Sequence, residues 1–126
     1  MPAKNPEDCT HLFGKHVGKG DLEGLISLYE EGATFVGSDR IVHTGLGSIR
    51  EILAALAEQR PQISMNVFKV VQVGDDLAVL YNDWTVIRKM PEGNPAEITN
   101  KAIELVRRQP DGSWRYVFDD PFARKE

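Results

Sequence analysis

Three carboxylic acid side chains in the second half of the chain could perform acid–base chemistry. Asp83, Glu104 and Asp119 each lie in a segment rich in β-branched and aromatic residues, so each is expected on a β-strand. Ionising several carboxyl groups in one apolar cavity is costly, so at least one would hold a proton near neutral pH. Carboxyl groups with raised or shared pKa values act as general acids and bases. If these side chains meet, the sequence predicts a catalytic cluster for proton transfer.

Alternation along the strands indicates which neighbours share a face with these carboxyl groups. Val117 shares a face with Asp119 on the last strand, and Val79 and Tyr81 share a face with Asp83. An alternative stays open: one or more of the carboxyl groups lie in water at strand ends, or pair with Arg88, Lys101 or Arg107.

The elements that must position these residues fall into two groups. Capping residues and apolar spacing predict helices over about 6–17, 21–32 and 45–59, with short strands at 33–36 and 41–43 between the last two. Four long strands are expected at 63–73, 77–89, 97–109 and 113–119, with turns at 74–76 and 110–112 and a longer loop at 90–96. Helices followed by consecutive hairpins indicate an α+β fold, with helices on one face of a curved antiparallel sheet. A small ligand would bind in the cavity between the two layers.

Composition limits the function classes. The 126 residues suit a single domain spanning 1–126, and 41% hydrophobic with 27% charged residues is typical of soluble globular proteins. The net charge of -4 disfavours a nucleic-acid partner, and no apolar segment is long enough to predict a membrane span. The single cysteine, Cys9, has no partner for an intrachain disulfide, which favours a cytoplasmic protein.

Several stretches resemble one known family. They are Gly20-Asp21-Leu22 with Leu28-Tyr29, then Ala33-Thr34-Phe35, then Gly45 with Ser48-Ile49-Arg50-Glu51, and finally the run from Val106 to Arg115. Together they resemble the nuclear-transport-factor-2-like superfamily, which includes ketosteroid isomerase and the SnoaL-like polyketide cyclases. The resemblance implies a cystatin-like, cone-shaped barrel. It also places Val79, Tyr81, Asp83, Glu104, Val117 and Asp119 on the concave side.

The resemblance to ketosteroid isomerase carries over only in part. That enzyme uses an Asp base beside an oxyanion hole made by a Tyr and a protonated Asp. The position of its tyrosine corresponds to Phe13, and the position of its base falls near Val36 or Gly37, none of which can perform these roles. Only the third position is matched, by Glu104. Steroid isomerisation is therefore not expected.

The polyketide cyclases and limonene-type epoxide hydrolases offer a better comparison. They place a working Asp on the last strand, which corresponds to Asp119 here, but the Arg-x-Asp pair of the hydrolases is replaced by Asp83 and Thr85. The resemblance implies a cofactor-independent isomerase, cyclase, dehydratase or hydrolase. Asp119 would be the acid or base, Asp83 and Glu104 would tune its pKa, and Tyr81 would position the substrate. The alternatives are a non-catalytic module that binds a ligand or dimerises, and a protein adaptor.

Two further expectations concern the histidines and the outer face. His11 and His16 are about 140° apart on a helix, so no metal site is expected, whereas His43 is expected near the cavity mouth as a ligand-binding residue with a pKa suited to proton transfer. A surface role for His43 stays open. The face opposite the cavity is expected to carry Trp84, Trp114, Tyr116 and Phe118, an apolar surface that a sheet-to-sheet homodimer would bury.

Overall fold

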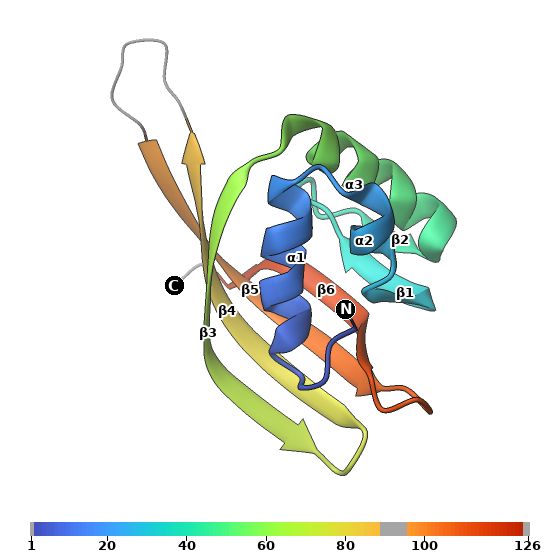
Figure 1. Cartoon of the computed structure of the whole chain (residues 1–126). Coiled ribbons are helices and arrows are strands. Elements are labelled where there is room, and N and C mark those ends of the chain that lie inside the picture. The colour runs from blue at the N-terminus through green and yellow to red at the C-terminus, as the bar shows by residue number, and fades with distance from the viewer. Residues whose placement is uncertain (1, 89–95, 125–126) are drawn as a thin grey trace.

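The computed structural model describes residues 2–88 and 96–124, and shows helices packed on one face of a curved sheet (Figure 1). The helices are α1 (Asp8–Gly18), α2 (Leu22–Ile26) and α3 (Leu46–Gln59). The strands are β1 (Tyr29–Val36), β2 (Val42–Thr44), β3 (Gln62–Val73), β4 (Leu77–Arg88), β5 (Ala96–Arg108) and β6 (Trp114–Arg124). The strand order is β2-β1-β6-β5-β4-β3, with β2 and β3 at the two ends of an unclosed sheet. The expected α+β, cystatin-like architecture is confirmed.

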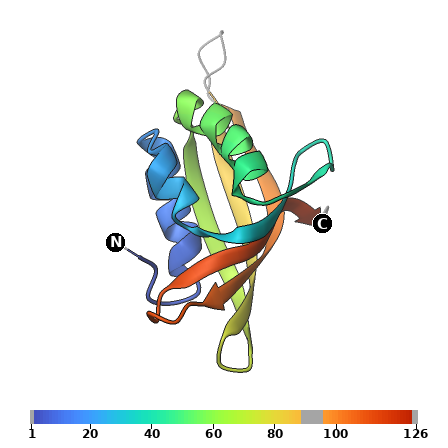
Figure 2. The same cartoon turned by 90° about the vertical axis from the view of Figure 1, so that its right-hand side faces the viewer.

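The helices cover the concave side of the sheet, and α3 crosses one end of it (Figure 2). Burial of Phe13 and Val17 holds α1 against the sheet, and Ile49 and Leu53 do the same for α3. Burying side chains of this kind contributes about 1.5–3 kcal/mol each. This packing leaves space between α3 and the far ends of the strands, which is where the cavity described below lies.

The segment predicted as a second helix over 21–32 contains a short helix followed by the start of a strand. The helix begins as expected, because the Asp21 carboxylate accepts a hydrogen bond of 2.9 Å from the backbone of Gly24. It ends at Ile26, however, and Tyr29 begins β1 by pairing with Tyr116. Local apolar spacing favoured helix here, but the strand pairing outweighed that weak preference.

The sheet is mixed rather than fully antiparallel. β1 runs parallel to β6, although the other four strand pairs are antiparallel. β6 also continues beyond the expected end at residue 119 to Arg124, and it passes Pro121 where the register with β5 shifts. A bulge of this kind tolerates proline because no ladder hydrogen bond is needed there. The expected loop lies largely outside the described residues, at 89–95, as does the Arg88 side chain.

Candidate active site

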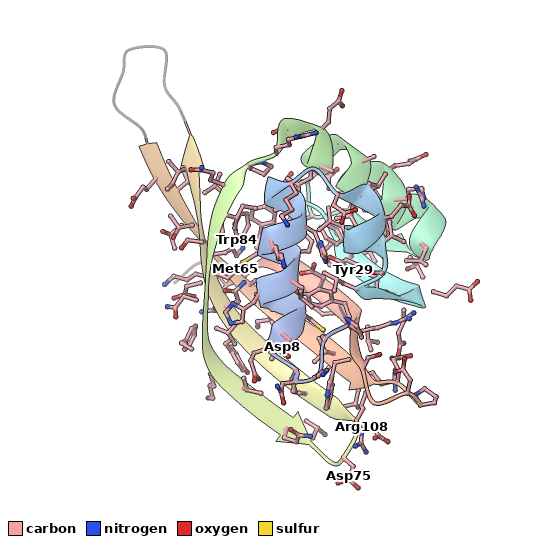
Figure 3. The ribbon with its side chains drawn as sticks, in the orientation of Figure 1. Asp8, Tyr29, Met65, Asp75, Trp84 and Arg108 are labelled. Atoms are coloured by element: carbon pink, nitrogen blue, oxygen red, sulfur yellow. The ribbon has the colours of Figure 1, made fainter. Side chains whose placement is uncertain are left out.

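A cavity of about 770 Å³ lies between α3, the concave face of the sheet and the segment that follows β1. Its walls are mainly aromatic and aliphatic side chains, including Phe13, Phe35, Ile52, Leu56, Met65, Trp84 and Phe122. Figure 3 shows Met65 and Trp84 beside each other on the side of the sheet that faces α1. Ser38, Gln59 and Ile87 are exposed members of the lining, so they mark the mouth of the cavity. The volume and the apolar walls suit a small organic ligand.

Two carboxyl groups line the inner part of this cavity. Glu104 on β5 and Asp119 on β6 are direct partners in the antiparallel ladder, so their Cβ atoms are about 4.5–5.5 Å apart. Both are buried, with exposed fractions of 5% for Glu104 and 3% for Asp119. The structure thus brings together two of the three carboxyl groups that the sequence singled out.

Burial makes both groups hold protons unusually tightly. The pKa of Glu104 is raised from 4.5 to about 8. Loss of hydration is the largest cause, and the negative charge of Asp119 adds to it. Loss of hydration also raises the pKa of Asp119 from 3.8 to about 7, although a hydrogen bond from Tyr29 opposes this shift. Asp119 therefore ionises first, and its charge keeps the proton on Glu104. Near pH 7 Asp119 is therefore about half ionised and Glu104 is mostly protonated, so the pair carries less than one full negative charge.

Hydroxyl groups fix the two carboxyl groups from both sides. Tyr29 donates to Oδ2 of Asp119 at 2.6 Å, and Thr10 on α1 donates to Oε1 of Glu104 at 2.6 Å. The Tyr116 hydroxyl donates in turn to Thr10 Oγ1 at 3.2 Å. Burial raises the pKa of both tyrosines well above the usual value, so they remain hydrogen-bond donors. Sequence reasoning missed Thr10 and Tyr29, because nothing local indicates that a helix and the first strand meet β5 and β6.

One polar atom at this site lacks a partner. Oδ1 of Asp119 is buried and accepts no hydrogen bond from any residue that the structure describes. A buried carboxylate oxygen without a donor is costly, on the order of 1–3 kcal/mol. Such an orphaned atom in a cavity wall is a natural contact point for a ligand.

The third carboxyl group lies on the opposite face, so its predicted position is wrong. Asp83 Oδ1 accepts a hydrogen bond of 2.8 Å from Arg124, which also lies over the Tyr81 ring. Asn82 and Trp84 line the cavity instead. Both faces of β4 carry large apolar residues, so alternation gave two sets without saying which was inside.

The other residues expected on that face share this outcome. Val79 and Tyr81 alternate with buried Leu80 and Asn82, and neither Val79 nor Tyr81 lines the cavity. They belong to the outer face with Asp83, so the predicted roles for all three as cavity residues are wrong.

A bulge in β6 corrects two further expectations. Val106 pairs with Tyr116, but its neighbour Leu105 pairs with Phe118, so Val117 is an extra residue. Tyr116 and Asp119 therefore both point inward, although strict alternation separates them. Val117 is only partly buried and does not line the cavity, contrary to its predicted ligand-binding role.

The bulge in β6 and the inward direction of Trp84 on β4 together change the face expected to form a dimer. Trp114 and Tyr116 are buried in the core, and Trp84 lines the cavity while its indole donates to the carbonyl of Pro121 at 2.8 Å. Of the four aromatic residues assigned to the outer face, only Phe118 belongs there, since it pairs with outward-facing Leu105.

Of the two remaining ligand-binding candidates, Phe13 and His43, only Phe13 lies in the cavity wall. Phe13 lines the cavity as expected. His43 does not line it, and its Nδ1 lies 3.0 Å from the Ser48 hydroxyl at the start of α3. The structure therefore places His43 in a local hydrogen bond rather than against a ligand.

Residues 2–88 and 96–124 form neither a metal-binding cluster nor a membrane-spanning helix. No group of three or more histidine, cysteine, aspartate or glutamate side chains there is arranged to hold a metal ion. Within the same residues, no helix has the length and apolar character needed to cross a membrane.

A curled mixed sheet with helices on its concave face, and a buried pair of carboxyl groups in the cavity between them, define the class of the protein: a small α+β domain with an internal acidic pocket. The model of the SnoaL-like domain matches residues 10–117, and the chain belongs to this family. The comparison with curated proteins gives no significant match.

Solved structures agree on the fold. A ketosteroid isomerase-like protein from Erwinia carotovora is 17% identical with a TM-score of 0.75, and the match covers 90% of this chain and 89% of that one. A conserved protein from Planctomyces limnophilus is 19% identical with a TM-score of 0.75, covering 92% and 91% of the two chains. A nuclear-transport-factor-2-like protein with a cystatin-like fold from Novosphingobium aromaticivorans is 20% identical with a TM-score of 0.76, covering 90% and 76%. At these identities the likeness establishes the fold alone.

Proposed function

We propose that the chain, acting as a single domain, is a cofactor-independent acid–base catalyst for a small, largely apolar substrate. One observation carries the proposal: the buried carboxyl group of Asp119 lines the cavity, has one oxygen without a hydrogen-bond partner among the described residues, and lies beside a second carboxyl group. An ionised carboxylate whose pKa is close to the working pH is well suited to general-base catalysis.

In this mechanism the ionised carboxylate of Asp119 removes a proton from the bound substrate and becomes neutral. Glu104, kept protonated by its burial, limits the negative charge that the cavity must carry. Tyr29 holds Oδ2 of Asp119, which leaves the unpartnered Oδ1 as the oxygen that would accept the proton. The deprotonated intermediate then takes this proton back at another atom, as in an isomerisation or cyclisation, or expels a hydroxyl group that leaves as water with this proton, as in a dehydration.

The test uses a probe whose only requirement is an accessible base. Removal of the ring C–H proton of 5-nitrobenzisoxazole breaks its N–O bond and yields a coloured cyanophenolate, so the rate can be followed by absorbance. The protein should accelerate this elimination, with a pH profile that rises through about 7 as Asp119 ionises. Asp119→Asn should abolish the acceleration while leaving the melting temperature nearly unchanged or raised, because it removes a buried charge.

Asp83→Asn is the matched control, since the same change is made on the outer face of the sheet. It should leave the rate within about twofold of the original, because an Asp far from the cavity contributes nothing to the barrier. An elimination rate in the original protein no higher than in Asp119→Asn would contradict the proposal that Asp119 is an accessible base.

A second candidate function is that of a binding or dimerisation module, and the outer face of the sheet favours the dimer. Val71, Val79, Leu105 and Phe118 lie opposite one another across β3, β4, β5 and β6. Val71 is 38% exposed in the isolated chain. A second copy of this chain would cover the row. By sedimentation velocity, the original protein should be a dimer and Val71→Glu a monomer, whereas Ile41→Glu, at another exposed apolar site near β2, should remain dimeric.

The compartment is a smaller part of the proposal. The one cysteine is buried and unpaired, which suits a reducing environment such as the cytoplasm. Fractionation of cells that express the tagged chain tests this directly, and recovery of the protein from an oxidising compartment would contradict it.

A further inference from the structure

The charges that face the cavity are all of one sign. Glu104 and Asp119 are its acidic members, and no lysine, arginine or histidine occurs among the described residues that line it. Two arginines are engaged with other carboxyl groups: Arg40 binds Asp120 through two hydrogen bonds of 2.7 and 2.8 Å, and Arg124 binds Asp83. A ligand with a carboxylate or phosphate would meet repulsion and no counter-charge.

Around the carboxyl pair, the side-chain atom without a hydrogen-bond partner among the described residues is an acceptor. The hydroxyl groups of Thr10, Tyr29 and Tyr116 all donate to partners inside the protein. The Trp84 indole donates to a backbone carbonyl. Oδ1 of Asp119, in contrast, receives no donor from the described residues. A ligand that completes this set must bring a donor of its own.

The walls near the carboxyl pair are suited to a cation. Phe13, Phe35, Trp84 and Phe122 contribute aromatic rings to the lining. The faces of such rings attract ammonium groups, by about 0.5–2 kcal/mol for each well-placed contact. Aromatic walls also bury the apolar part of the same ligand.

We propose that the ligand of this site is a hydrophobic amine, whose ammonium group donates to Oδ1 of Asp119 while its apolar body lies against the aromatic walls. This inference names the ligand class for the site described under Proposed function, and it rests on that proposal for the location. Once Asp119 is ionised and Glu104 keeps its proton, the pair carries one negative charge, so a ligand with a single positive charge neutralises it.

Binding of an ammonium group favours the ionised form of Asp119, so it should depend on pH. The groups that face Asp119 are Glu104 on β5, Tyr29 on β1, and Tyr116 and Asp120 on β6, with Cys9 of α1 near Glu104. Both tyrosines and Cys9 remain neutral because burial raises their pKa values, and Asp120 is paired with Arg40. The carboxyl pair is therefore the part of this set that titrates between pH 6 and pH 8, about one unit either side of the pKa of Asp119.

The experiment compares three probes that share an indole ring and differ in their polar end. Tryptamine carries an ammonium group, tryptophol carries a hydroxyl in its place, and indole-3-propionate carries a carboxylate. Isothermal titration calorimetry on the full chain should give tryptamine the tightest binding, about tenfold or more tighter than tryptophol, since hydrogen bonds to charged groups are the stronger ones. Indole-3-propionate should be weaker than either. The affinity for tryptamine should rise from pH 6 to pH 8.

Variants assign the effect to a single group. Asp119→Asn should reduce tryptamine affinity about tenfold or more and leave tryptophol affinity nearly unchanged. Asp75→Asn, which removes an exposed carboxyl group in the turn between β3 and β4, should change neither. Tryptamine should also inhibit elimination of 5-nitrobenzisoxazole competitively. In buffers of different ionisation enthalpy, the heats should report proton release on binding at pH 7.

Each other result overturns the inference. Equal affinity for tryptamine and tryptophol, tighter binding of indole-3-propionate, or tryptamine binding that survives Asp119→Asn would each exclude an ammonium ligand at this carboxylate. Such a failure leaves the elimination assay unaffected, so Asp119 could still be an accessible base. The separate result that contradicts the proposed function is an original protein that does not accelerate the elimination more than Asp119→Asn does.

Discussion

Replacing Glu104 with glutamine should make the protein more stable at neutral and alkaline pH. Gln has nearly the same shape as Glu, and its carbonyl can still accept the hydrogen bond from Thr10. What the substitution removes is the cost of ionising a carboxyl group in a buried site. Glu104 is among the most buried charged residues in the described part of the chain.

The size of the effect follows from the pKa. Burial raises the pKa of Glu104 from 4.5 to about 8, so the folded protein holds this proton more tightly than the unfolded chain does. Stability from this group is therefore complete below pH 4.5 and is lost as the pH rises through 8. The loss amounts to on the order of 5 kcal/mol above pH 8, and about 3 kcal/mol at pH 7.

Urea unfolding followed by tryptophan fluorescence, repeated across this pH range, measures the difference. The free energy of unfolding of Glu104→Gln should match that of the original protein near pH 4.5 and exceed it increasingly toward pH 8. Glu58→Gln is the control, because it makes the same chemical change at an exposed position of α3. A difference between Glu104→Gln and the original protein that does not vary with pH, or a less stable variant at pH 8, would refute the reasoning.

Three further predictions concern other parts of the structure. Tyr29→Phe removes the hydrogen bond that lowers the pKa of Asp119, so the pH midpoint of 5-nitrobenzisoxazole elimination should move above 7. Gly20→Ala should lower the free energy of unfolding in urea by about 1 kcal/mol or more, because Gly20 has φ of 68° and an added Cβ would lie 2.7 Å from Arg60 Nε. Cys9 is fully buried, and burial raises the pKa of its thiol, so an aromatic disulfide reagent should modify it only as fast as the protein unfolds. A native-state reaction as rapid as that in urea would contradict this expectation.

The order of the elements could be predicted from the sequence, as could two of the three carboxyl positions. Glu104 shares a face of β5 with Ala102 and Val106, but Ile103 and Leu105 form an equally apolar set on the other face, so its inward direction followed from the family resemblance. The inward direction of Asp119 could be predicted only from the family resemblance. Strict alternation would place Tyr116 and Asp119 on opposite faces, whereas the extra residue Val117 puts both on the same face. Bulges of this kind leave no clear signal in composition.

The position of Asp83 shows the limit of reasoning from alternation. Strand β4 places Leu80, Asn82 and Trp84 on one side and Tyr81 and Asp83 on the other, and both sets include large side chains. Local sequence defines the two sets, but only packing against the helices selects the buried one. The Arg124 contact that holds Asp83 on the outer face depends on the extension of β6 beyond Pro121, which sequence reasoning ended too early.

The sequence by itself determined the α+β class, the placement of helices before long hairpins, and the presence of carboxyl groups within apolar strands. These properties depend on residue spacing, turn residues and side-chain type, all of which act over a few neighbouring positions. The tertiary structure decided that Glu104 and Asp119 meet, that Tyr29 and Thr10 hold them, and that one buried oxygen of Asp119 has no hydrogen-bond partner among the described residues. Those contacts join α1, β1, β5 and β6 across up to 94 positions of sequence, and the loss of water around the pair, which no local pattern encodes, raises the pKa values.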